Sequence, residues 1–161
     1  MVFEHSMKAA YEVAEFLWKL RMRLRFGELS RAPLQLLRFE MTAGRATCEW
    51  LSRDADPFDA NLAAATRDGN ATLQALLDAI ALRHMLFSSI PEVREARFRV
   101  YRQLESHTRE LIITGLVSKD DTPPQVGSLV MRAKLYGFHF SIQEGVLAPL
   151  HAGSESLRFA T

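Results

Sequence analysis

The sequence predicts an α+β fold in which about three helices pack on a mainly antiparallel sheet around a single core. Three observations lead to this prediction. Several short segments alternate apolar and charged residues, which is the two-residue period of a half-buried strand. Other segments repeat apolar residues every three or four positions, as an amphipathic helix does. Turn residues then divide the strands into adjacent antiparallel pairs.

Length and composition indicate one globular unit. The chain has 161 residues, of which 48% are apolar and 24% are charged. These fractions are close to the averages for soluble globular proteins, and the length suits one domain. We expect residues 1–151 to form a single α+β domain and residues 152–161 to form a loose C-terminal tail.

The first helix is predicted over residues 3–16, where apolar residues recur at helical spacing. In the next segment, "WKLRMRLRF" (18–26), apolar and basic residues alternate strictly, which favours a strand with its basic residues on one face. The alternative is a longer helix. That helix would leave Trp18, Met22 and Phe26 on its solvent-exposed side and would bury the remaining apolar positions, which are Val13, Phe16, Leu17, Leu20 and Leu24.

A β-hairpin is predicted over residues 34–53. Leu37, Phe39 and Met41 alternate with polar residues, and Ala46, Cys48 and Trp50 do the same after Thr42-Ala43-Gly44. Glycine can adopt the positive φ that such a turn requires. The alternation places Cys48 and Trp50 on the same face, which we expect to be the buried one.

The acidic segment Asp54-x-Asp56-x-x-Asp59 predicts the start of the second helix. Aspartate is favoured at the N-cap position, which Asp56 would occupy. Pro57 suits the first helical position, and Asp59 falls in the first turn. A calcium-binding loop counted from Asp54 would need glycine and glutamate where the chain has Asp59 and Ala65. We therefore predict a capped helix running from this point to about Ser88, with a kink at 68–70 and with Leu62 and Ala65 among its inward-facing residues.

The second half of the chain continues the alternation of strands and helices. "EARFRVYRQL" (95–104) and "ELIITGLVSK" (110–119) are expected to pair as a hairpin. The spacing of Thr122 and Gln125 is that of a capping box, so a third helix is predicted over 123–136, ending at Gly137. Residues 138–150 should close the fold as a hairpin with its turn at Gln143-Glu144-Gly145 and with Phe138, Phe140 and Ile142 inward.

No recognisable catalytic signature or cofactor motif is present, and we expect neither a metal nor a cofactor. The histidines do not have the spacing of zinc ligands, and the glycines form no phosphate-binding loop. His84 lies on the apolar side of the second helix, which favours a core histidine over a catalytic base. His107 falls in a turn and Cys48 on a buried face, so a surface role and a packing role are favoured over catalysis.

Two basic segments give the one pattern that indicates a ligand. If 18–26 is a strand, Arg21, Arg23 and Arg25 form a basic row on its outer face. The later strand adds further candidates for contact with an anion or nucleic acid, which are Arg97, Arg99 and Tyr101. The alternative is that these arginines pair with glutamates on neighbouring strands. The formal net charge of only +1 favours the paired arrangement.

Three functions remain open from the sequence. The favoured one is a small binding or interaction module that forms a homodimer and frames a subunit interface or a pocket for a small apolar ligand. The alternatives are a domain that binds single-stranded nucleic acid through the basic strand face, and an enzyme with dispersed acid-base residues. The chain lacks a signal-peptide pattern, and its longest strongly apolar run, 111–118, is too short to span a bilayer. We therefore expect a soluble cytoplasmic protein without a membrane partner.

Overall fold

The computed structural model describes residues 2–24, 27, 29–30, 32–54, 56–120 and 125–151, so the predicted tail lies outside the described residues. The elements follow one another as α1 (Val2–Arg23), β1 (Gln35–Thr42), β2 (Arg45–Leu51), the 3-10 helix η1 (Pro57–Asn61), α2 (Ala64–Ser89), β3 (Glu95–Gln103), β4 (Arg109–Ser118), α3 (Leu129–Leu135), β5 (Phe138–His139), β6 (Ile142–Gln143) and β7 (Val146–Leu147).

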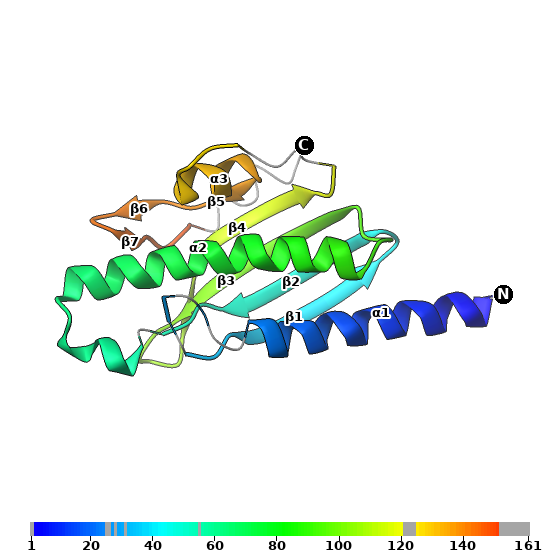
Figure 1. Cartoon of the computed structure of the whole chain (residues 1–161), viewed down its shortest axis with the longest axis horizontal. Helices are drawn as coiled ribbons and strands as arrows, with labels where there is room; N and C mark the ends of the chain where they lie inside the picture. Colours follow the sequence, from blue (N-terminus) through cyan, green and yellow to red (C-terminus); the bar gives the residue numbers. More distant parts are fainter. Residues whose placement is uncertain are drawn as a thin grey trace.

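Helices α1 and α2 cover one face of a five-stranded sheet whose strands lie in the order β1-β2-β3-β4-β5 (Figure 1). Strands β6 and β7 form a separate two-stranded sheet beside the β4 edge. The neighbouring strands of the large sheet are antiparallel except for β2 and β3, which are parallel. This arrangement confirms the predicted α+β class with a mainly antiparallel sheet.

The parallel pair joins the two predicted hairpins into one sheet. Parallel neighbours require a long crossover connection, and η1 and α2 provide it between β2 and β3. The register sets Cys48 beside Phe98 and Trp50 beside Val100. Trp50 and Phe98 are fully buried, and their rings meet edge to face with centroids 5.6 Å apart. The buried faces of both hairpins therefore contribute to one core beneath α2, as the alternation predicted.

The strand predicted over 18–26 is wrong. Residues up to Arg23 belong to α1, and Arg25 and Phe26 lie outside the described residues. The segment is helical because the apolar stripe of the longer helix packs into the core. Phe16 of this stripe is fully buried, and its ring centroid lies 5.2 Å from that of Phe39. Leu20 is also buried, whereas Trp18 is 61% exposed.

The second helix begins later than predicted. Asp56 does act as an N-cap, and its Oδ1 accepts a hydrogen bond from the Phe58 N–H at 3.0 Å, but the element it caps is η1. Leu62 then adopts an extended conformation and α2 starts at Ala64. Leu62 and Ala65, which were expected to point inward, are exposed. Helix α2 runs without a break through 68–70.

The C-terminal elements are shorter than predicted. Ser128 caps α3, and Thr122, Pro123 and Pro124 of the predicted capping box lie outside the described residues. The expected end at Gly137 is confirmed by its positive φ of 103°. The predicted closing hairpin is divided, because β5 pairs with β4 while only β6 and β7 pair across the turn at Glu144-Gly145. Ile142, expected to be inward, is 37% exposed.

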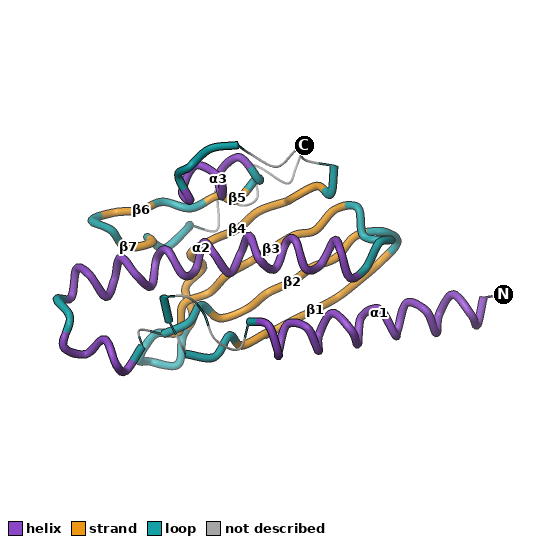
Figure 2. The backbone as a smooth tube through the Cα atoms, viewed as in Figure 1, coloured by secondary structure: helices purple, strands orange, loops and turns teal. Residues whose placement is uncertain are grey.

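The loops gather at the two ends of the sheet (Figure 2). The segment after α1, the segment between β2 and η1, and the β3–β4 turn lie at one end. The β1–β2 turn and the α2–β3 connection meet at the other, where the Arg94 N–H donates to the Gly44 carbonyl at 2.8 Å. Within the described ranges, no helix is both long and apolar enough to cross a membrane.

Candidate functional site

A buried polar cluster fixes the loop after α1 against α2. Arg53 Nε donates to Asp78 Oδ2 at 2.8 Å, and Gln74 Nε2 donates to Asp78 Oδ1 at 2.9 Å. The other guanidinium nitrogens of Arg53 donate to the carbonyls of Ala32 and Leu24. Burial raises the pKa of the Asp78 carboxyl, and the hydrogen bonds and charge of Arg53 and the Gln74 amide oppose that rise. The partners within this cluster satisfy one another, which indicates a structural role.

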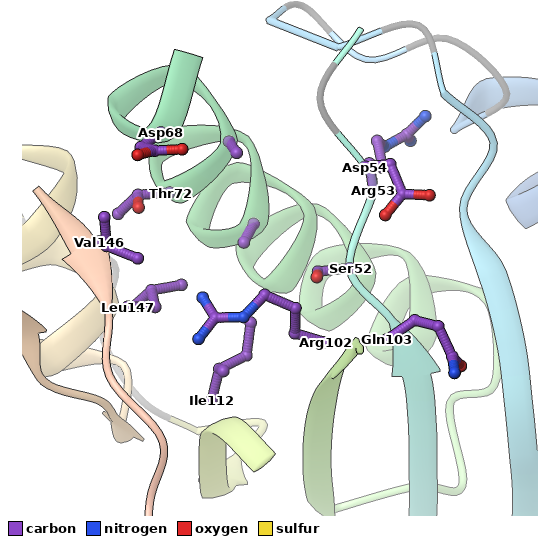
Figure 3. Close-up of a pocket in the computed structure, with 12 residues that line it drawn as sticks. Ser52, Arg53, Asp54, Asp68, Thr72, Arg102, Gln103, Ile112, Val146 and Leu147 are labelled. Carbon is purple, nitrogen blue, oxygen red and sulfur yellow. The ribbon is translucent and has the colours of Figure 1, made fainter. Parts of the chain in front are cut away.

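This cluster separates two cavities. The first, of about 190 Å³, lies between α2, the ends of β2 and β3, and β7. Figure 3 shows Asp68 and Thr72 of α2 beside Val146 and Leu147, with the Arg102 side chain extending toward them from β3. Arg102 Nε donates to Glu110 Oε1 at 2.6 Å, and Thr72 Oγ1 donates to the Gly145 carbonyl at 2.8 Å. The polar groups are thus largely engaged with the protein itself.

The first cavity is smaller than most ligand-binding sites. None of its described lining residues is a histidine or a cysteine. Its volume is below the range of about 300–1,000 Å³ that is usual for ligand pockets. The cavity is therefore a small gap between α2 and the β6–β7 sheet.

The face of the sheet opposite the helices holds the second set of predicted contact residues. Arg97, Arg99 and Tyr101 lie on β3 and share this face. Their expected acidic partner is Glu49 of β2, whose Oε1 accepts from Tyr101 Oη at 3.2 Å and from Arg99 Nη1 at 3.5 Å. Arg38 of β1 also lies 3.5 Å from Glu49. Cross-strand pairing therefore describes this face better than a row of uncompensated arginines does.

The basic row predicted from Arg21, Arg23 and Arg25 is not formed. Arg21 and Arg23 both lie in the last turn of α1, where two-residue steps turn the side chains about 200° apart around the helix, and Arg25 lies outside the described residues. Arg21 and Arg23 are also not part of the sheet that carries Arg97 and Arg99. Of the two basic segments named in the nucleic-acid hypothesis, only the one on β3 therefore lies on a strand.

The three candidates for catalysis lie on separate elements of the fold. Cys48 is fully buried, and burial followed by the Glu49 charge raises the pKa of its thiol, which disfavours the nucleophilic thiolate. His107 lies in the β3–β4 turn, with a positive φ of 62°, and is exposed. His84 is not the buried core residue that was expected, because it lies on an exposed position of α2. The structure does not bring these three residues together.

The outer face of α1 is the feature that the strand interpretation concealed. Four large apolar side chains lie along this face, with exposed fractions of 60% for Met7, 71% for Tyr11, 61% for Trp18 and 56% for Met22. Their spacing of four, seven and four residues keeps them on one side of the helix. The sequence did indicate part of this stripe, because the longer helix considered for 18–26 placed Trp18 and Met22 on its solvent-exposed side.

A second cavity, of about 350 Å³, lies between the C-terminal end of α1, α2 and α3. Arg23, His84 and Arg132 are among the residues that line it. No sequence pattern indicated this grouping, because the three residues come from three separate helices.

Comparisons with protein-family models, with curated proteins and with solved structures found no match to this chain.

Proposed function

We propose that this protein is an interaction module that pairs with a second copy of itself through the outer face of α1. The observation that carries the proposal is the exposed stripe formed by Met7, Tyr11, Trp18 and Met22. Scattered apolar residues are common on protein surfaces, but a contiguous apolar stripe with two aromatic rings is typical of an interaction site. Tyrosine and tryptophan are also the residues that most often dominate binding energy at interfaces.

The stripe is self-complementary when two copies of α1 run antiparallel. Met7 and Met22 lie at equal distances from the midpoint between Ala14 and Glu15, and so do Tyr11 and Trp18. A twofold axis at this midpoint would place each aromatic residue of one copy against the other aromatic of its partner. The small Ala14 would lie at the crossing point, where it lets the two helices approach closely. Such isologous pairing is the commonest form of homo-oligomer.

Charge supports the antiparallel orientation over the parallel one. The basic residues Lys19, Arg21 and Arg23 lie together at the C-terminal end of α1. A parallel pair would set the two basic ends side by side and would align the two helix dipoles unfavourably. An antiparallel pair places the two basic ends far apart and opposes the dipoles.

The area of the stripe suits a weak dimer. A fully buried aromatic side chain covers about 150–250 Å², and the aromatics of the stripe are more than half exposed. With the two methionines, two copies would together bury on the order of 1,000 Å², which is near the lower limit for a specific interface. We therefore expect a monomer–dimer equilibrium that depends on concentration.

Sedimentation velocity over a wide range of protein concentration tests this proposal. We expect the parent to shift from monomer to dimer and Trp18→Glu to remain monomeric. Phe58→Glu is the matched control, because Phe58 is 80% exposed but lies on η1 rather than on α1. If the parent stays monomeric at the highest concentration, the self-association proposal is wrong, and the stripe would then bind a different protein.

Cysteine crosslinking tests the orientation. The native Cys48 is buried and should stay silent. In the antiparallel pair, the two copies of position 14 would lie within about one helical rise of each other along the axis, so Ala14→Cys should form a disulfide-linked dimer. Met22→Cys should not crosslink to itself, because its two copies would lie about 22 Å apart. Crosslinking of both variants would indicate a parallel pair instead.

A further inference from the structure

The cavity between the three helices combines an apolar floor with a basic rim. Its floor is formed by Leu24, Leu77, Ile80 and Ala81, and its volume of about 350 Å³ falls within the range of small-molecule sites. Its rim carries Arg23 from the last turn of α1, His84 from α2 and Arg132 from α3. We refer to this site as the three-helix cleft.

Among the described residues, the two arginines that line the three-helix cleft have no acidic partner. Within the described part of the chain, neither Arg23 nor Arg132 forms an ion pair, and the Nε of Arg132 is buried without a hydrogen-bond partner. A buried donor that is left unsatisfied costs free energy, so such a group calls for an explanation. Asp78 also lines the cleft, but its carboxylate is already bound by Arg53 and Gln74.

His84 adds a hydrogen-bond donor to the same rim. Its Nδ1 lies 3.2 Å from Arg83 Nη1, and because a guanidinium can only donate, Nδ1 must accept. The neutral ring then carries its proton on Nε2, which remains able to donate. Partial desolvation of the ring lowers the pKa of His84, and the charges of Arg83 and Arg132 lower it further.

We propose that the three-helix cleft binds a small amphipathic anion, with the anionic head on Arg23 and Arg132 and an aliphatic or aromatic body on the floor. The planar fork of an arginine matches a carboxylate or a phosphate in two parallel hydrogen bonds. An anion would supply the negative partner that neither arginine has among the described residues, and it would relieve the repulsion between them. The apolar floor selects an anion with a hydrocarbon body over a bare ion.

Three probes with the same chain length and different heads test the charge requirement: octanoate, octan-1-ol and octyltrimethylammonium. Isothermal titration calorimetry on the full chain should show saturable binding of octanoate and little or none of the other two. Octyl phosphate shows whether a phosphate head binds as well as a carboxylate head does. Inorganic phosphate has no hydrocarbon body and therefore shows how much that body contributes to binding. Equal binding of octanol and octanoate, or no binding of either octyl anion, would overturn the proposal.

Substitutions locate the site. Arg132→Gln should weaken octanoate binding about ten-fold or more, since hydrogen bonds to charged groups are among the stronger ones. Arg23→Gln provides a second test at an exposed position, where folding is not at risk. Arg94→Gln is the matched control, because the Arg94 side chain is 69% exposed and lies away from the cleft. Unchanged affinity in both cleft variants would place any bound octanoate elsewhere and overturn the proposal.

A substitution that changes no charge separates the floor from the rim. Ala81→Phe should fill part of the floor and weaken octanoate binding. If Ala81→Phe leaves octanoate binding unchanged while Arg132→Gln abolishes it, the site recognises only the anionic head and the amphipathic class is wrong. The cleft and the proposed dimer surface involve different residues, so failure of one proposal leaves the other standing.

Discussion

Arg53 and Asp78 form an ion pair that solvent does not reach: Arg53 Nε lies 2.8 Å from Asp78 Oδ2, and the two side chains are 0% and 2% exposed. Removing two charges from water is costly, so a pair of this kind persists only when further hydrogen bonds complete it. Gln74 completes the carboxylate, and two loop carbonyls complete the guanidinium. The pair thereby holds the segment after α1 against the middle of α2.

The first prediction concerns this pair. Arg53→Met should lower the free energy of unfolding by about 3–5 kcal/mol, because it leaves the Asp78 carboxyl buried without its cation. The double variant Arg53→Met/Asp78→Leu should recover part of that loss, since apolar residues often replace a buried ion pair without penalty. Urea unfolding of the parent, both single variants and the double variant measures the coupling. A double variant that is no more stable than Arg53→Met would contradict the buried-charge explanation.

The sequence could predict the elements that rest on local patterns. The alternation in 45–51 and 95–103 identified which side chains are buried, and Trp50 and Phe98 both have no exposed surface. It could not show that β2 and β3 lie side by side and parallel, because that pairing depends on α2 returning the chain across the sheet. The capping role of Asp56 was also readable, but not that η1 would end after one turn.

The segment 18–23 was misassigned because its pattern satisfies two periods at once. Apolar residues at even positions give a strand, and those at 13, 16, 17, 20 and 24 give a helical stripe. Local sequence offers no means to choose, because the choice comes from the packing of Phe16 against Phe39 on β1, the strand that follows α1. The three-helix cleft is unpredictable for the same reason, since Arg23 and Arg132 are brought together only by the tertiary fold.

The second prediction compares two glycines in opposite settings. Gly69 lies inside α2, and a Cβ added there would meet nothing within 4 Å. Gly69→Ala should therefore stabilise the protein by about 0.4–1 kcal/mol, by restricting the unfolded chain and favouring the helix.

Gly137 is the opposite case. Its φ of +103° is one that side-chain-bearing residues rarely adopt, and an added Cβ would lie 3.1 Å from the Leu116 carbonyl oxygen. Gly137→Ala should destabilise the protein by about 1–3 kcal/mol. Parallel urea titrations of both variants give the comparison, and two shifts of the same sign would count against these local conformations.

The last prediction concerns the pH dependence contributed by His84. Partial desolvation of this exposed ring, with the charges of Arg83 and Arg132, holds its pKa below the ordinary value of 6.5 in the folded protein. Between that ordinary value and the lower folded one, the unfolded chain binds more protons than the native state does. The contribution of His84 to stability is therefore complete above about pH 6.5 and is lost as the pH falls toward and below the folded pKa. His84→Gln should thus reduce the stability lost between about pH 7 and pH 5 relative to the parent. His107→Asn in the exposed β3–β4 turn serves as the control. Urea unfolding at a series of pH values measures this difference. If His84→Gln loses as much stability as the parent on acidification, the assignment of a neutral ring to His84 is incorrect.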